Sequence, residues 1–221
     1  MGRKIVFVPS EFYHLYNRGV EKRNIFLNEK DYDRFLSLLY LCNATEPVHL
    51  QHRGSTFTEA AQVSRKDTLI DIASYCLMPN HFHLLVREKE EGNISRFMQK
   101  LATGYTMYFN TKRERSGSLF EGTFKARHVD DDRYLKYVIA YINLNPVKLI
   151  EPSWKETGIK DRKKAEKFLE HYRYSSYLDH LQQGRVEKCI INPEVLLEYE
   201  DLHNFKESVT EWLSYNHPLQ G

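Results

Sequence analysis

The sequence is poor in cysteine, with Cys42, Cys76 and Cys189 as its three cysteines in 221 residues. Their number is odd and their spacing is wide, so they form neither a disulfide framework nor a Cys-x-x-Cys metal site. This usage suits a reducing compartment, and we expect a cytoplasmic protein.

Long hydrophobic runs and a charge excess are also missing. No apolar run approaches the roughly 18 residues of a membrane span, and the basic start of the sequence lacks the apolar core of a signal peptide. We therefore expect no membrane partner. Lys and Arg number 32 against 30 Asp and Glu, so total charge neither requires nor excludes nucleic acid. A hydrophobic content of 41% excludes a disordered chain.

Hydrophobic periodicity predicts a series of strands and helices. The expected strands cover 12–17, 69–78, 81–87 and 119–127; the expected helices cover 28–42, a long stretch after Gly92-Asn93, and 133–145. This order predicts an α+β fold, an antiparallel sheet with helices packed on one face. We expect one domain over residues 1–180, with 43–68 as a loop or insertion, and a small helical extension over 181–221.

Two histidines flank one phenylalanine in His81-Phe82-His83, directly after the turn Met78-Pro79-Asn80. Side chains alternate along a strand, so His81 and His83 are expected on one face, about 6–7 Å apart, and Phe82 on the other. Two imidazoles on one face can bind a single divalent metal. A histidine beside a buried strand is more often structural, so the motif alone leaves both interpretations open.

A stripe of tyrosines lies along one face of the predicted helix that ends before Pro146. Tyr134, Tyr137 and Tyr141 stand at positions i, i+3 and i+7 and share one helix face, which Asn145 joins four residues after Tyr141. Such a stripe is typical of packing against a sheet. A phenol beside an amide and two histidines also has a chemical use, because a phenolate is a nucleophile and a metal ion polarises a phosphate.

Four blocks of the sequence, in this order, resemble the signature blocks of a known family. They are Tyr13-His14-Leu15-Tyr16-Asn17-Arg18-Gly19, Met78-Pro79-Asn80-His81-Phe82-His83-Leu84-Leu85, Ser118-Leu119-Phe120-Glu121-Gly122-Thr123-Phe124-Lys125 and Tyr141-Ile142-Asn143-Leu144-Asn145-Pro146-Val147-Lys148. The family is the single-tyrosine transposases of the HUH (His-hydrophobe-His) endonuclease superfamily. The resemblance covers roughly residues 10 to 180, and the order and spacing of the blocks are most similar to the REP-associated tyrosine transposase branch.

The resemblance implies a ferredoxin-like (RRM-like) HUH fold and a set of site residues. Carried over, His81, His83 and Asn145 bind Mg²⁺ or Mn²⁺, and Tyr141 is the nucleophile. Relatives from insertion sequences often have Gln where this chain has the shorter Asn145. Tyr137 is the rival nucleophile, but Tyr141 alone has Asn145 at the family spacing. The implied activity is cleavage and rejoining of single-stranded, hairpin-containing DNA through a 5′-phosphotyrosine link.

Clusters of basic residues are candidates for contacts with DNA phosphates. They are Arg18, Lys112, Arg113, Arg115, Lys125 and Arg127. The resemblance is compatible with a monomer or a homodimer.

Two other functions fit parts of the sequence. One is a metal hydrolase in which His81 and His83 help to activate water, with Asp71 as the nearest acidic candidate. The other is a hairpin DNA or RNA binding protein that keeps the fold without catalysis.

Overall fold

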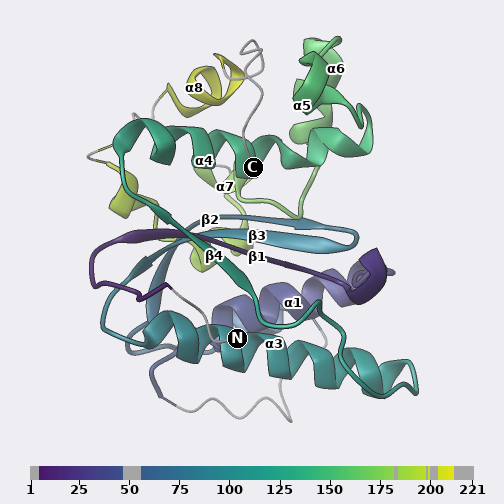
Figure 1. Ribbon diagram of the computed structural model, residues 1–221, viewed down its shortest axis with the longest axis vertical. Helices are drawn as coiled ribbons and strands as arrows, with labels where there is room; N and C mark the ends of the chain where they lie inside the picture. The colour runs from purple at the N-terminus through teal and green to yellow at the C-terminus, as the bar shows by residue number, and fades with distance from the viewer. Residues whose placement is uncertain (1–4, 47–55, 182–183, 198, 200–203, 212–221) are drawn as a thin grey trace.

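A four-stranded antiparallel sheet lies at the centre of the computed structural model, which describes residues 5–46, 56–181, 184–197, 199 and 204–211 (Figure 1). Its strand order is β2-β3-β1-β4. The strands are β1 (Phe12–Arg18), β2 (Ile70–Met78), β3 (His81–Glu88) and β4 (Lys125–Val129). In β1 and β3, Tyr16 pairs with His83 and Arg18 pairs with His81, so the first signature block lies beside the histidine motif at one end of the sheet. The third block reaches the same end through the pairing of Lys125 with Tyr16 and the bridge between Phe120 and Gly19.

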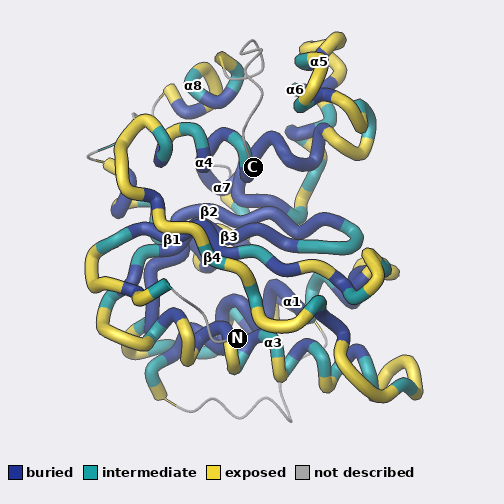
Figure 2. Tube along the Cα trace, in the orientation of Figure 1, coloured by how far each residue is buried: buried dark blue, intermediate teal, exposed yellow. Residues whose placement is uncertain are grey.

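Helices cover both faces of this sheet. Helices α1 (Glu29–Leu41) and α3 (Asn93–Lys112) pack on one face, and α4 (Asp132–Leu144) packs on the other (Figure 1). Leu84 on β3 belongs to the first core, whereas its neighbour Leu85 belongs to the second. The sheet is accordingly buried at its centre and exposed along β4 (Figure 2).

The predicted α+β class with an antiparallel sheet is confirmed, but the placement of the helices on one face is corrected. All nine residues of β2 are buried. A strand of nearly continuous apolar residues is typical of a sheet that is covered on both faces. The apolar composition of residues 69–78 therefore indicates that helices cover the sheet on its second face as well.

Most predicted elements lie where they were expected, with two differences. The strand predicted over 119–127 begins at Lys125, because Gly122 adopts a left-handed backbone with φ of 67° and Phe120 makes only an isolated bridge to Gly19. The predicted loop over 43–68 contains a short helix, α2 (Phe57–Ala61), while its residues 47–55 lie outside the described residues.

Short helices follow α4 and lead into the C-terminal part of the chain. They are η3 (Asn145–Leu149), α5 (Trp154–Thr157), α6 (Arg162–Leu169), α7 (Tyr177–His180), η4 (Val186–Ile190), η5 (Pro193–Leu196) and α8 (Phe205–Glu211); η1 (Val20–Lys22) follows β1. Ile190 joins the first core, and Leu196 and Phe205 join the second. The division of the chain at residue 180 stays a prediction. No helix in the described ranges is long and apolar enough to cross a membrane.

Helix α4 begins and ends at residues that the sequence marks. The Asp131 side chain caps its first turn by accepting a hydrogen bond from the Tyr134 amide at 2.8 Å. The chain then continues through Asn145 into η3, where Pro146 prevents further regular helix. Tyr141 and Asn145 are thereby held one helical turn apart on the same side.

A buried polar network fastens α4 to the sheet. The Asn143 amide nitrogen donates to Ser74 Oγ of β2 at 3.3 Å, and the Asn143 amide oxygen accepts from Ser176 Oγ at 3.1 Å. Ser74 Oγ also contacts Nε2 of His180 at 2.9 Å. These contacts lie within an otherwise apolar layer that includes Ile139 and Ile142.

Gly19, directly after β1, provides a test of the packing at this end of the sheet. A methyl group added there would overlap the carbonyl oxygen of Arg23 and lie 2.9 Å from the Ile25 side chain. We expect Gly19→Ala to lower the free energy of unfolding by about 1–3 kcal/mol, measured by urea denaturation. Gly184→Ala is the matched control, since an added methyl there meets no atom within 4 Å. Equal stability of the two variants would contradict this expectation.

Candidate active site

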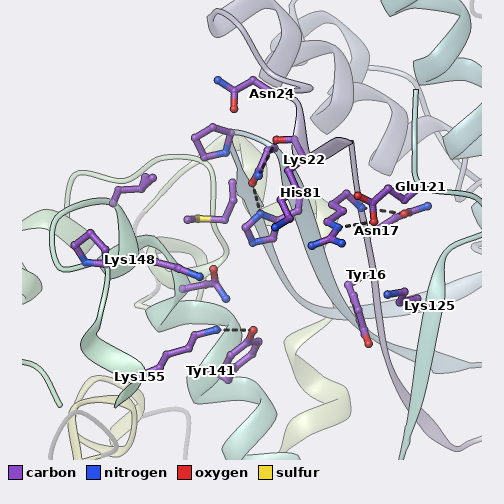
Figure 3. Close-up of a pocket in the computed structure, with 17 residues that line it drawn as sticks. Tyr16, Asn17, Lys22, Asn24, His81, Glu121, Lys125, Tyr141, Lys148 and Lys155 are labelled. Carbon is purple, nitrogen blue, oxygen red and sulfur yellow. Dashed lines mark hydrogen bonds and ion pairs between the residues drawn. The ribbon is translucent and has the colours of Figure 1, made fainter. Parts of the chain in front are cut away.

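A pocket of about 660 Å³ opens at the end of the sheet where β1 and β3 meet α4 (Figure 3). Five cationic side chains and one carboxylate line it: Arg18, Lys22, Lys125, Lys148, Lys155 and Glu121. Glu121 is paired with Arg18. The pocket is therefore strongly positive and suits an anionic ligand such as a nucleic-acid backbone.

The histidine motif forms one wall of this site. His81 lines the pocket, and the imidazole centroids of His81 and His83 lie 5.1 Å apart. Phe82 points to the opposite face, where it belongs to the core beneath α1 and α3. The predicted alternation of these three side chains is confirmed.

Hydrogen bonds fix the orientation of both imidazoles through their Nδ1 atoms. His81 Nδ1 donates to the Asn80 side-chain oxygen at 2.6 Å, and His83 Nδ1 lies 2.9 Å from His14 Nε2. In each ring, Nε2 is the atom left for a further ligand. Hydrogen bonding through the second ring nitrogen is the usual arrangement of metal-binding histidines.

Burial keeps the three histidines of the site neutral. Desolvation lowers the pKa of His14 and that of His81 to about 4, and it lowers the pKa of His83 well below its ordinary value. The nearby Lys155 ammonium acts in the same direction on all three. Neutral imidazole is the protonation state that a metal ligand requires.

Asn145 completes the set of donors at the start of η3. Its side chain is 1% exposed, and neither its amide oxygen nor its nitrogen has a partner within hydrogen-bond geometry. The amide nevertheless lies close enough to His81 and Tyr141 to raise the pKa of the imidazole and to lower that of the phenol. Buried amides without partners are rare because desolvation is costly. Two imidazole nitrogens and an orphaned amide oxygen fit a divalent cation. Among the described residues there is no group of three or more His, Cys, Asp or Glu that could hold a metal, so such a site depends on Asn145.

Tyr141 reaches this site from α4. Its ring centroid lies 5.3 Å from that of His83 and 5.8 Å from that of His14. The hydroxyl accepts a hydrogen bond from Lys155 Nζ at 2.8 Å (Figure 3). Burial raises the pKa of Tyr141, and burial lowers the pKa of Lys155 to about 8. The tyrosine stripe is present as predicted, with ring centroids 5.9 Å apart from Tyr134 to Tyr137 and from Tyr137 to Tyr141.

The predicted DNA-binding residues are divided between three places. Arg18 and Lys125 line the pocket, and Arg127 lies 4.6 Å above the Tyr134 ring. The other three lie near the end of α3, outside the pocket lining, and contact other side chains of the chain. Lys112 and Arg113 bind the buried Asp31, and Arg115 binds Asn110.

Two residues of the site had no role in the sequence-based prediction. His14 stood within the first signature block, but its contact with His83 depends on how β1 pairs with β3. Lys155 was one of several lysines after Pro152, fourteen residues beyond Tyr141. Alternation along β1 places His14 on the same face as Phe12 and Tyr16, and this pattern could have pointed to His14. No local pattern marks Lys155.

Comparisons with known proteins identify the family of the chain. A family model described as "Transposase IS200 like" matches residues 36–145, which include His81, His83, Tyr141 and Asn145. A solved structure of a REP-associated tyrosine transposase bound to a REP hairpin is similar to this chain with a TM-score of 0.55 and 12% identity, covering 85% of this chain and 90% of that chain. No curated protein matches the chain. The chain therefore belongs to the IS200-like transposase family, a family of DNA-cleaving enzymes.

Proposed function

We propose that this protein cleaves and rejoins single-stranded DNA next to a hairpin, through a covalent link between Tyr141 and a 5′ phosphate. The observation that carries the proposal is the convergence of the Tyr141 hydroxyl, two oriented imidazoles and an orphaned amide at one cationic pocket. The similar solved structure holds a REP hairpin, which supports hairpin DNA as the partner.

Charge and shape support a single strand in the pocket. Arg18, Lys22 and Lys125 are placed to neutralise phosphates. The half-buried Tyr16 lines the same wall, where an unpaired base can stack on its ring. The pocket lies at the end of the sheet (Figure 3) and has a volume of about 660 Å³.

His81, His83 and Asn145 are the residues that would hold a divalent cation, Mg²⁺ or Mn²⁺. Such an ion, when bound, supplies positive charge to the scissile phosphate and stabilises the charge that develops during transfer. Asn80 and His14 hold the two imidazoles in place. A metal on His83 Nε2 would leave the proton on Nδ1, so His83 would donate to His14 Nε2.

In the proposed reaction the Tyr141 oxygen attacks phosphorus in line with the departing 3′ oxygen. The bond from the tyrosine oxygen to phosphorus forms while the bond from phosphorus to the 3′ oxygen breaks, leaving a free 3′ hydroxyl. Attack by a 3′ hydroxyl on the phosphotyrosine reverses the step and rejoins DNA. The phosphoester energy is conserved, so no nucleotide cofactor is needed.

The geometry is less suited to water activation. Asp71 accepts hydrogen bonds from the Arg87 guanidinium at 2.9 and 3.1 Å. Arg87 stands six residues beyond His81 on β3, about 20 Å away at the rise of a strand. Glu121 lines the pocket but is paired with Arg18. Neither carboxylate is placed to act as a base beside the histidines.

The test is to incubate the protein with Mn²⁺ and labelled single-stranded DNA that carries a hairpin. We expect a protein–DNA adduct that survives denaturation, with the nucleotide on the peptide that contains Tyr141 by mass spectrometry. Cleavage without an adduct would indicate attack by water. Binding without cleavage in Mn²⁺ and in Mg²⁺ would indicate a non-catalytic binding protein, and either outcome would overturn the proposal.

His14 gives a second prediction, because it contacts His83 and does not line the pocket. We expect His14→Ala to raise the Mn²⁺ concentration for half-maximal adduct formation by about 10–100-fold, since loss of a hydrogen bond that orients a metal ligand has this effect. His14→Gln, which can keep the contact with His83, should recover part of the loss. An unchanged Mn²⁺ dependence in His14→Ala would show that the contact does not support metal binding.

A further inference from the structure

Tyr141 faces a chemical difficulty as a nucleophile. A phenol has a pKa of about 10 in water, and burial raises the pKa of Tyr141 above that value. The hydroxyl is therefore protonated at neutral pH and attacks a phosphate poorly. A nearby group must take its proton during the reaction.

The contacts of the Tyr141 hydroxyl point to one group. Lys155 Nζ lies 2.8 Å from the hydroxyl oxygen and 4.1 Å from the ring centroid. Among the described residues, it is the only titratable side chain with a hydrogen bond to that oxygen. Helix α5 delivers Lys155 to the pocket wall (Figure 3), so the amine lies where the scissile phosphate would enter.

Two histidines and one carboxylate near the pocket are committed elsewhere, and Lys148 lowers the pKa of Tyr141 through its charge. The Nδ1 atoms of His81 and His83 are hydrogen-bonded to Asn80 and His14, and their Nε2 atoms serve the proposed metal site. Glu121 is held by Arg18. None of these groups has a hydrogen bond to the Tyr141 hydroxyl in the part of the chain that the structure describes.

The surroundings of Lys155 favour loss of its charge. Burial lowers its pKa to about 8, and the neighbouring Glu156 and the buried Cys76 of β2 oppose this shift. On β1 and β3, the groups that face it are the neutral imidazoles of His14, His81 and His83. A fraction of Lys155 is therefore a neutral amine near pH 7, and its lone pair can accept the proton of the hydroxyl 2.8 Å away.

We propose that Lys155 is a catalytic residue that takes the hydroxyl proton of Tyr141 during cleavage and returns it during rejoining. This inference rests on the proposed role of Tyr141. As the tyrosine oxygen bonds to phosphorus, its proton moves to Nζ and the amine becomes an ammonium. The departing 3′ oxygen takes a proton from water. In the reverse step, the ammonium protonates the departing tyrosine oxygen.

The test is the single-turnover rate of adduct formation with hairpin DNA and saturating Mn²⁺. We expect Lys155→Ala to slow it by about 10²–10⁴-fold, the usual contribution of general acid–base catalysis, with circular dichroism unchanged. The DNA is kept at a saturating concentration, so that loss of one pocket cation does not limit the rate. Added primary amines should restore the rate, and more basic amines, compared at equal concentrations of neutral amine, should restore it more. Lys163→Ala, an exposed lysine of α6, is the matched control and should keep the wild-type rate.

The pH profile separates proton transfer from simple charge stabilisation. The wild-type rate should rise with pH and level off above about 8, the pKa of Lys155. The neutral amine of Lys155 is the active form, and above this pH nearly all of Lys155 is neutral. Lys155→Arg keeps a positive charge that does not titrate in this range, so we expect it to be as slow as Lys155→Ala. A wild-type rate in Lys155→Arg, or no rescue of Lys155→Ala by any amine, would overturn the role of Lys155 while an adduct on Tyr141 still supports the proposed function. Absence of any adduct in the wild-type protein would overturn both.

Discussion

Replacing Tyr141 by phenylalanine is expected to reduce formation of the covalent DNA adduct by at least about 10⁴-fold, as loss of an enzymatic nucleophile does. The substitution removes one oxygen and keeps the ring that packs against His83 and His14. Stability and hairpin affinity should therefore remain close to those of the wild-type protein. The measurement is the yield of denaturation-resistant adduct over time, with a gel-shift titration of the same DNA.

Tyr137→Phe is the matched control for this variant. Tyr137 is on the same helix, one turn earlier, and its ring lies between those of Tyr134 and Tyr141. It does not line the pocket, and we expect Tyr137→Phe to form the adduct at close to the wild-type rate. The opposite pattern, with activity in Tyr141→Phe and none in Tyr137→Phe, would reassign the nucleophile. Activity in both single variants would show that the tyrosines substitute for each other or that water attacks.

Loss of the motif histidines should have the second largest effect. We expect His81→Ala to lower the rate of adduct formation by about 10³-fold or more at fixed Mn²⁺, because stabilisation of the developing phosphate charge contributes several kcal/mol. His81 is half-buried at the pocket wall, so its removal leaves a smaller packing defect than removal of the buried His83. Binding of Mn²⁺ without DNA, followed by electron paramagnetic resonance, should weaken in parallel.

His128→Ala controls for the loss of an imidazole from the sheet. His128 is on β4, bonded to Glu11 and 42% exposed at its side chain, and it is not among the pocket residues. Its removal should change neither Mn²⁺ binding nor adduct formation. Asn145→Ala extends the series, since the orphaned amide oxygen should matter for metal binding although it carries no charge. Unchanged Mn²⁺ binding in both His81→Ala and Asn145→Ala would exclude this donor set.

Most strands and helices could be predicted from the sequence, because the spacing of apolar residues reflects which side chains of each element are buried. Asn28 caps α1 by accepting from the Asp31 amide, and Pro146 stops α4, each by a local rule. The strand that becomes β4 was placed too early, because the buried Leu119 and Phe120 belong to a turn that contacts the first core. Local patterns cannot distinguish an apolar strand from an apolar turn.

The candidate site was predictable only in part, for a similar reason. His81, His83, Tyr141 and Asn145 were found from short-range spacing together with a family resemblance. His14 and Lys155 enter the site through pairing of β1 with β3 and through the path of the chain after η3. Lys112 and Arg113 were predicted to contact DNA because they form a basic cluster, but in the structure they pair with the buried Asp31. Whether a lysine contacts a nucleophile, a phosphate or an internal carboxylate is decided by tertiary contacts.

The polar network around Asn143 fixes the axial register of α4 against the sheet. A slip of one residue along a helix moves each side chain by about 1.5 Å and turns it by about 100°, enough to carry Tyr141 away from His83. Apolar side chains alone tolerate such sliding, whereas Asn143 would lose its hydrogen bonds to Ser74 and Ser176, and its buried amide oxygen would lose the hydrogen bond from Ser176. The alignment of the tyrosine with the imidazoles is thus encoded by side chains on the far side of the helix, which take no part in the chemistry.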